Sequence, residues 1–155
     1  MPANPYPVLR QRILNAKVRM EKPPPKPIAF AGMMEMGVEN GVASLAVIAD
    51  GTTSLYYSNG GGIIGAGQRE PVKKPSTLFL GMLSRHLGDM GPDPTGVTPG
   101  DGIIHLRAMT TDGRRLLAAA PEEDLKAKRH PLWEAFYAGH AVITALRTLP
   151  PIKTA

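Results

Sequence analysis

The sequence predicts an α+β protein: a five-stranded, largely antiparallel sheet with helices packed on it and a helical arm at the N-terminus. Two observations carry this prediction. The dipeptide Asp-Gly stands twice between apolar runs, at 50–51 and 112–113, which is a strong hairpin signal because glycine reaches positive φ without steric cost. A stretch with apolar residues at helical spacing then follows each hairpin. The 155 residues, 43% hydrophobic and 20% charged, have the composition of one globular domain.

The expected strands are short runs rich in β-branched, aromatic and other apolar residues. The first strand opens the body, and the other four form the two hairpins around the Asp-Gly pairs. They are residues 28–36, 42–49, 53–58, 103–110 and 114–120.

Two helices are expected in the body, one after each hairpin. A stripe from Leu78 to Leu87 predicts the first, which ends near Gly88. Pro131 opens the second, which ends before Pro150. The segment 88–102 is polar and rich in glycine and proline, so we expect an exposed connection there.

Charge divides the chain into an arm and a body. The net charge of +5 lies wholly in residues 1–27, which hold six basic residues and one acidic residue, while the remainder holds twelve of each. The domain organisation predicted is a basic arm with a Pro-rich spacer, residues 1–27, and a single α+β domain, residues 28–155. Because every expected strand and body helix lies after residue 27, the body is predicted to fold without the arm.

The arm is predicted to be a short helix with Pro7 in its first turn. Its apolar residues recur on one side, and its basic residues lie mainly off that side and are expected to be solvated. An isolated helix this short is not stable in water, so it needs a surface to fold against. That surface is the body, a partner protein or a second copy of the chain. The expected partner-binding residues are Leu9, Ile13, Met20, Arg10, Arg12, Lys17 and Arg19.

A glycine-rich stretch, SNGGGIIGAG at 58–67, contains G-x-G-x-x-G. A nucleotide site needs a helix directly after such a turn, and here Pro71 and Pro75 are expected to interrupt it. No acidic residue closes a second parallel strand, as the dinucleotide motif requires. We therefore interpret the glycines as a turn or bulge followed by a short strand. A ligand-binding loop at Gly60, Gly62 and Gly65 is the alternative.

No other motif indicates a chemistry. The chain has no cysteine, which removes disulfides and thiol catalysis. No pair of histidines has metal-ligand spacing, and no serine lies in a nucleophile elbow. The histidines are His86, His105, His130 and His140, and the serines are Ser44, Ser54, Ser58, Ser76 and Ser84. The sequence therefore predicts no catalytic residue, no metal and no cofactor, and it favours a protein without enzymatic activity.

Neither a signal-peptide core nor a membrane span is predicted. The N-terminal residues contain no apolar run of the kind a signal peptide needs, and no apolar stretch approaches the ~18 residues of a spanning helix. We expect a cytoplasmic protein, in keeping with the lack of cysteine.

The segments GVASLAVIADGTTSLYYSNGGGIIGAG and HPLWEAFYAGHAVITALR resemble segments of an uncharacterised family of small bacterial proteins, and this resemblance implies no site. The order of strands and helices is loosely similar to the roadblock/profilin-like architecture, whose members are non-catalytic dimers that serve as adaptors or regulators. The function predicted is a non-catalytic adaptor, regulatory or structural subunit that self-associates. Two alternatives stay open: a ligand-binding domain or enzyme using Gly60–Gly67, and polyanion binding by the basic arm.

Overall fold

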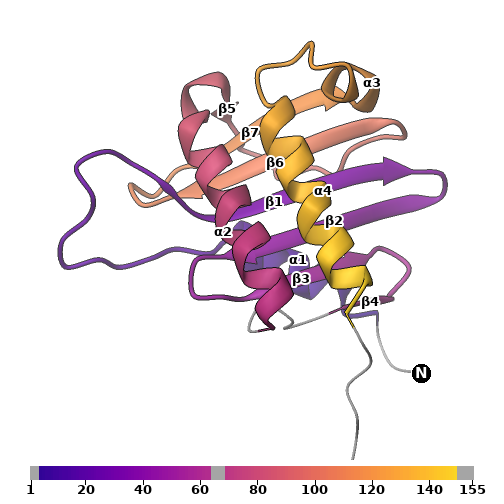
Figure 1. Ribbon diagram of the computed structural model, residues 1–155, viewed down its shortest axis with the longest axis horizontal. Helices are drawn as coiled ribbons and strands as arrows, with labels where there is room; N and C mark the ends of the chain where they lie inside the picture. Colours follow the sequence, from indigo (N-terminus) through magenta and orange to yellow (C-terminus); the bar gives the residue numbers. More distant parts are fainter. Residues whose placement is uncertain (1–3, 64–68, 150–155) are drawn as a thin grey trace, which may run out of the picture.

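The computed structural model describes residues 4–63 and 69–149, which form an α+β fold built on one antiparallel sheet (Figure 1). The sheet order is β4-β3-β2-β1-β6-β7-β5, so β1 lies at its centre. The elements are α1 Tyr6–Leu14, β1 Ala29–Val38, β2 Gly41–Ile48, β3 Thr53–Tyr57, β4 Gly62–Ile63, α2 Glu70–Arg85, the 3₁₀ turn η2 Leu87–Asp89, β5 Gly91–Pro92, β6 Ile103–Thr110, β7 Arg115–Pro121, α3 Glu122–Lys126 and α4 Trp133–Arg147.

The two Asp-Gly pairs stand at the turns of the β2–β3 and β6–β7 hairpins. Gly51 has φ of 102° and Gly113 has φ of 84°, a backbone region that glycine enters without strain. The sheet is antiparallel throughout, because β1 pairs antiparallel with both β2 and β6 and the hairpins extend it on either side. The expected α+β class with an antiparallel sheet is confirmed.

The expected strand number is wrong, because the sheet has seven strands and not five. The two additional strands, β4 and β5, are each two residues long and lie at the two edges. Strand β4 begins in the stretch where a short strand was expected after the glycines, outside the five strands counted. Strand β5 is too short to show the alternation of apolar and polar residues that reveals a strand in a sequence. Part of the segment 88–102 is thus a strand and not only a loop. Both edge strands cover backbone groups of longer strands that would otherwise be unpaired.

Helix α2 corrects the expectation that prolines interrupt a helix after the glycine-rich stretch. It begins at Glu70, carries Pro71 in its first turn and contains Pro75 in its interior. A proline at the helix start costs little, because the amide it lacks has no intrahelical partner there. Pro75 removes one donor early in the helix, and the burial of Phe79 and Leu83 beyond it offsets that loss. Among the helices of the described residues, none is long and apolar enough to cross a membrane.

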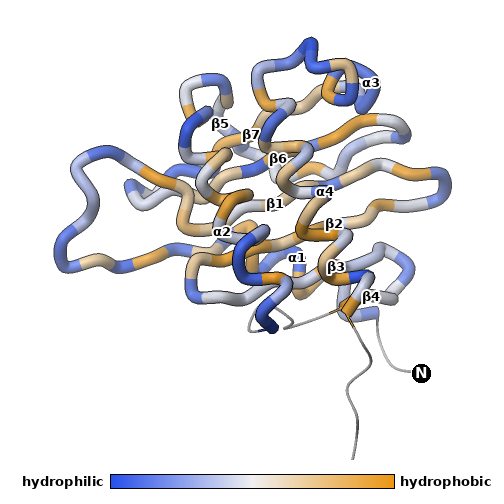
Figure 2. Tube along the Cα trace, in the orientation of Figure 1, coloured by the Kyte–Doolittle hydropathy of each residue, from blue (hydrophilic) through white to orange (hydrophobic). Residues whose placement is uncertain are grey.

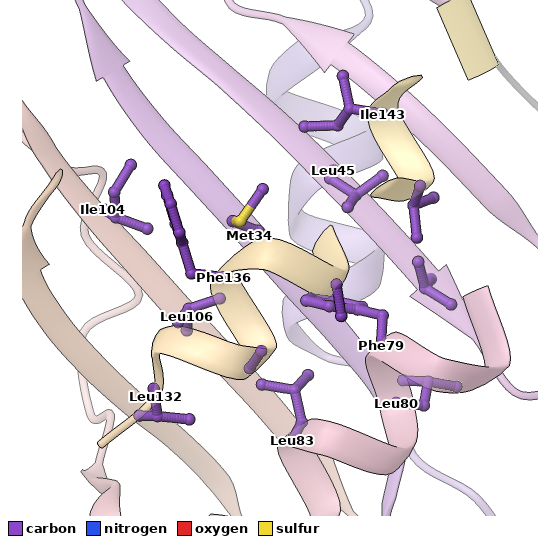
Figure 3. Packing of buried hydrophobic residues seen from close by; sticks show 14 of the residues in the cluster. Met34, Leu45, Phe79, Leu80, Leu83, Ile104, Leu106, Leu132, Phe136 and Ile143 are labelled. Atoms are coloured by element: carbon purple, nitrogen blue, oxygen red, sulfur yellow. The ribbon is translucent and has the colours of Figure 1, made fainter. Parts of the chain in front are cut away.

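Helices α2 and α4 lie side by side on one face of the sheet and enclose the main hydrophobic core. Figure 3 shows Phe79 and Leu83 of α2 and Phe136 of α4 packed against Met34 and Leu106 of the sheet. Two glycines permit the close approach of these helices. A Cβ atom on Gly32 of β1 would lie 2.4 Å from a methyl carbon of Leu83, and one on Gly139 of α4 would lie 2.7 Å from the Met34 sulfur.

Helix α1 packs on the opposite face of the sheet, behind it in Figure 1. It ends at Leu14, with Asn15 as its C-cap, so the expected helical stripe is cut short and Met20 lies in the segment that follows. The side chains packed between α1 and the sheet form a second, smaller core. Its buried members are Tyr6, Ile13, Leu14, Phe30, Ala31, Met33, Ala46, Tyr56 and Met109.

Candidate functional site

Charged side chains gather on the sheet face that α1 covers, and they come from distant parts of the chain. Glu35 of β1 and Arg107 of β6 have fully buried side chains. Around them lie Arg10 of α1, Asp93 of the segment between β5 and β6, and Arg115 of β7. A buried charge costs a large free energy unless it is paired, so the contacts of these five residues decide what the cluster can do. We call it the buried ion cluster.

Glu35 is the acceptor at the centre of the cluster. Arg10 binds it in bidentate fashion, with Nε 2.8 Å from Oε2 and Nη2 2.8 Å from Oε1. Arg107 donates from Nη1 to Oε1, and the Ser44 hydroxyl donates to Oε2 at 2.5 Å. The Tyr6 hydroxyl lies 2.8 Å from Ser44 Oγ. The Tyr6 hydroxyl also donates to Oε2 at 3.5 Å, so the carboxylate receives hydrogen bonds from four side chains on three different elements.

Asp93 forms the second half of the cluster. Its Oδ2 accepts from Arg107 Nε at 2.8 Å and forms an ion pair with Arg115, whose Nε lies 3.0 Å away and donates to the Asp93 backbone carbonyl. Arg107 also donates from Nη2 to the Val97 carbonyl, and Arg115 donates from Nη1 to the Leu14 carbonyl at 3.1 Å. These bonds fasten both the C-terminal end of α1 and the segment around residues 93–97 to the sheet.

The charges keep both carboxyl groups ionised. Burial alone raises the pKa of Glu35, but the hydrogen bonds from Arg10 and Ser44 and the charge of Arg107 outweigh burial and hold that pKa below its ordinary value. Burial likewise raises the pKa of Asp93, and its bonds to Arg107 and Gly96 and the Arg115 charge bring it below the ordinary value. Three guanidinium groups face two carboxylates, so the cluster keeps one excess positive charge.

His105 lies beside this cluster, with Nδ1 3.2 Å from the Val97 carbonyl oxygen. Burial and the neighbouring Arg107 charge lower its pKa. The imidazole is therefore neutral at pH 7, and it adds no further positive charge to the cluster.

The cluster is a structural clamp and does not have the geometry of a catalytic centre. Ser44 and Glu35 stand as a nucleophile and its base would, but both are fully buried. A carboxylate that already binds two guanidinium groups is also a poor proton acceptor, because its pKa is depressed. The buried ion cluster holds α1 against the sheet.

The structure separates the expected partner-binding residues into two groups. Ile13 is buried against the sheet and Leu9 is partly buried, whereas Met20, Arg12, Lys17 and Arg19 are exposed. The expectation that the arm's basic side chains are solvated is wrong for Arg10, which is only 9% exposed. Its position on α1 directs it towards Glu35, a partner that cannot be recognised from the arm alone.

Sequence reasoning missed Glu35 and Arg107, although a signal for them exists. Each is a charged residue within a strand whose other residues are almost all apolar, AFAGMMEMGV in β1 and IIHLRAMT in β6. One acidic and one basic residue in two such strands indicate a buried pair wherever the strands are neighbours. The strand order, which the sequence does not reveal, was needed to bring them together.

The glycine-rich stretch is only partly described, since Gly65 lies outside the described residues. Gly60 has φ of 104° at the turn between β3 and β4. A Cβ on Gly62 would lie 2.3 Å from the Leu55 carbonyl oxygen, so this glycine permits close pairing with β3. A cavity of about 90 Å³ lies between this turn and α1. It is well below the ~300 Å³ at which small-molecule pockets begin.

A second hollow, of about 270 Å³, lies between the β2–β3 turn and α2. Its charged residues already have partners. Asp50 accepts a hydrogen bond from the Thr52 amide at 2.9 Å, and Lys73 lies 3.5 Å from Glu70. The Ser76 hydroxyl at its floor lies 3.0 Å from the Thr53 hydroxyl. Asp50, Lys73 and Ser76 are thus each engaged by a residue outside the lining of the hollow.

The histidines and acidic residues do not assemble a metal site within the described residues, where no three potential ligands group together. His86 lies 3.1 Å from Asp89, and the ring of His130 accepts from the Leu132 amide at 3.1 Å. His140 stacks edge-on against Phe136, with ring centroids 4.5 Å apart.

The chain matches no protein-family model, and neither the curated proteins nor the solved structures include one that is significantly similar to it.

Proposed function

We propose that this protein is a non-catalytic adaptor, regulatory or structural subunit that binds an acidic partner protein through its N-terminal segment. The contact strip consists of the outward side of α1 and the segment 15–28. Its exposed residues are Val8, Val18, Met20, Ile28, Arg12, Lys17, Arg19, Lys22 and Lys26.

One observation carries this proposal. Of the eight large apolar side chains exposed among the described residues, four lie in the contact strip, including Val8 at 58% and Met20 at 44% exposure. Figure 2 shows hydrophobic and hydrophilic stretches alternating along the strip's protruding loop, at the left of the view. Exposed apolar side chains gathered in this way are typical of a protein interaction surface.

Charge indicates the kind of partner. Within the described residues, no acidic side chain forms an ion pair with Arg12, Lys17, Arg19, Lys22 or Lys26. Apolar side chains interspersed with unpaired basic ones fit a partner surface that is apolar at its centre and acidic around it.

The position of Tyr6 favours a protein over single-stranded nucleic acid. Stacking on aromatic side chains is a main source of affinity in single-strand binding. Tyr6, which is the one aromatic residue of the arm, is 7% exposed and bonded to Ser44 inside the second core. It is therefore not free to stack on a base.

The proposal is tested with two triple variants that leave the buried ion cluster intact. Val8→Ser/Val18→Ser/Met20→Ser removes apolar contact, and Arg12→Gln/Lys17→Gln/Arg19→Gln removes charge. The immobilised wild-type protein should retain a specific acidic polypeptide from an extract of the source cells. Nuclease treatment should not reduce this retention, and both triple variants should retain much less of the polypeptide. The control, Lys74→Gln/Leu78→Ser, changes exposed residues of α2 and should bind like wild type.

Two results would contradict the proposal. One is retention of nuclease-sensitive material that only the charge variant loses and that falls steeply with salt, which would indicate polyanion binding. The other is undiminished capture of the polypeptide by both triple variants, which would place the contact surface elsewhere.

A further inference from the structure

Helix α1 is bound to its own sheet as a separate helical ligand would be bound in a groove. Four side chains of α1 enter the surface of the sheet: Tyr6, Arg10, Ile13 and Leu14. We call the receiving surface the arm site. It is formed by Phe30, Met33, Glu35, Ala46, Tyr56 and Met109.

The segment 15–28 joins α1 to β1, and its middle part projects from the body, whereas Ala16 packs on the second core and Ile28 bonds to Thr111. Figure 1 shows it looping out beyond the sheet and helices, at the left of the view. Within the described residues, no hydrogen bond joins 17–27 to the rest of the chain. The segment exposes Val18, Met20 and Ile28, so its apolar side chains gain little from the closed position.

Prolines make this loop a stiff connection. Pro23, Pro24 and Pro25 are consecutive, and such a run favours an extended polyproline conformation. In the structure the chain instead bends at 21–22 and at 25–26 as it returns from α1 to β1. At ~3.3 Å per extended residue, the segment can reach on the order of 45 Å.

We propose that two copies of this chain exchange their N-terminal arms, so that α1 of each docks on the arm site of the other. This goes beyond the proposed function: it assigns the sheet side of α1 to a second copy, and it leaves the outward side of α1, with Val8 and Arg12, open to a partner. Every contact of α1 is reproduced in the exchanged dimer, because Arg10 meets the same Glu35 on another copy. The segment 15–28 becomes extended, and the two segments run beside each other and bury their apolar side chains.

Charge gives the exchange a distinctive salt dependence. The two extended segments each carry Lys17, Arg19, Lys22 and Lys26, and these like charges repel when the segments lie together. Salt screens exposed charges, so added salt should increase exchange. Binding of an acidic partner by the contact strip should respond in the opposite sense.

The cysteine-free chain permits a direct test by disulfide linkage. The Asn4 side-chain nitrogen donates to the Ser58 carbonyl at 2.7 Å. Asn4 is exposed just before α1, and Ser58 is half-buried just after β3. Asn4→Cys and Ser58→Cys are made in separate chains, mixed at high protein concentration, unfolded, refolded together and oxidised. Arm exchange predicts a disulfide-linked heterodimer at twice the 16.5 kDa chain mass, in larger yield as salt is added.

Two controls define the outcome. The chain with both substitutions, refolded in dilute solution, should link internally, which verifies the geometry. A mixture of Asn4→Cys with Thr144→Cys, an exposed position on α4 on the opposite face, measures chance linkage. Replacing Pro23, Pro24 and Pro25 by glycine should reduce the heterodimer towards that background. Arm exchange is overturned if the mixture of Asn4→Cys and Ser58→Cys chains yields no more disulfide-linked dimer than the control mixture. That result would leave the capture experiment on the contact strip unaffected.

Discussion

Arg10 and Glu35 form a bidentate ion pair across the boundary between α1 and the sheet, with both nitrogen–oxygen distances at 2.8 Å. Glu35 is fully buried, and Arg10 is nearly so. The pair joins the N-terminal helix to the central strand, and it is therefore the contact by which the arm becomes part of the fold.

Arg10→Ala should lower the free energy of unfolding by about 3 kcal/mol, because removing one partner of a buried pair leaves the other undercompensated. Arg107 and Ser44 stay bonded to Glu35 and keep the loss from being larger. Arg12→Ala is the matched control, an exposed arginine two residues further along the same helix, and should change stability by less than ~0.5 kcal/mol. Urea denaturation compares them. Equal effects of the two substitutions would show that the pair does not hold the helix.

Acid should destabilise the protein through Glu35 and Asp93. Their pKa values are lowered in the folded state, so the unfolded chain binds protons first as the pH falls below ~4. The stabilisation by the two ionised carboxylates is complete at pH values above their unfolded-state pKa values. It is lost as the pH falls through their lower folded-state pKa values. Glu35→Gln, already less stable at pH 7, should show a shallower fall of the unfolding free energy in acid. An unchanged slope would contradict the ionised state assigned to Glu35.

His140 should give a second pH dependence, nearer neutrality. Among the described residues its Nε2 has no hydrogen-bond partner, and burial, with Lys126, lowers its pKa despite the charge of Glu122. The pKa of His140 is lower in the folded state than in the unfolded chain. Its contribution to the free energy of unfolding is therefore complete above pH ~6.5 and is lost as the pH falls below that value. His140→Leu should flatten this part of the stability profile, leaving the contribution of His105, whose pKa is also lowered. A profile identical to wild type would place the His140 ring in water.

Gly37 should tolerate no larger residue. A Cβ there would lie 1.7 Å from the Gly100 carbonyl oxygen, so Gly37→Ala must push the backbone of the segment 93–101 away from the sheet. That segment supplies Asp93 and Val97 to Arg107, and we expect a loss of about 2 kcal/mol or more. Gly81→Ala is the contrasting case, since nothing lies within 4 Å of the added carbon in α2; it should gain ~1 kcal/mol from helix propensity. Thermal unfolding of both variants decides between these opposite signs.

Much of the sheet follows from local patterns. The Asp-Gly pairs and the apolar runs beside them placed the five long strands to within a few residues, because hairpins depend on contacts between neighbours in sequence. The edge strand β5 escaped prediction because pairing with β7, and not composition, makes Gly91–Pro92 a strand. Strand β4 begins where a short strand was expected after the glycines, although that strand was not counted among the five.

The buried ion cluster depends on strand order, which no local pattern contains. Glu35 and Arg107 are far apart in sequence and meet because β6 pairs with β1. For the same reason the arm could not be recognised as part of the fold. The sequence predicts a body that folds without residues 1–27, whereas the structure places Tyr6, Ile13 and Leu14 in the second core, so we expect a chain without them to be markedly less stable.

We propose that α1 has one side fixed to the sheet while its other side stays open for a partner. Thiol labelling of two single variants in the cysteine-free chain tests this most directly. Val8→Cys places a thiol on the exposed side of α1, and Ile13→Cys places one on the buried side. We expect the first thiol to react as fast as a free thiol, the second to react far more slowly, and Arg10→Ala to remove the difference. Equally fast labelling of the two positions in the chain with Arg10 intact would contradict this proposal.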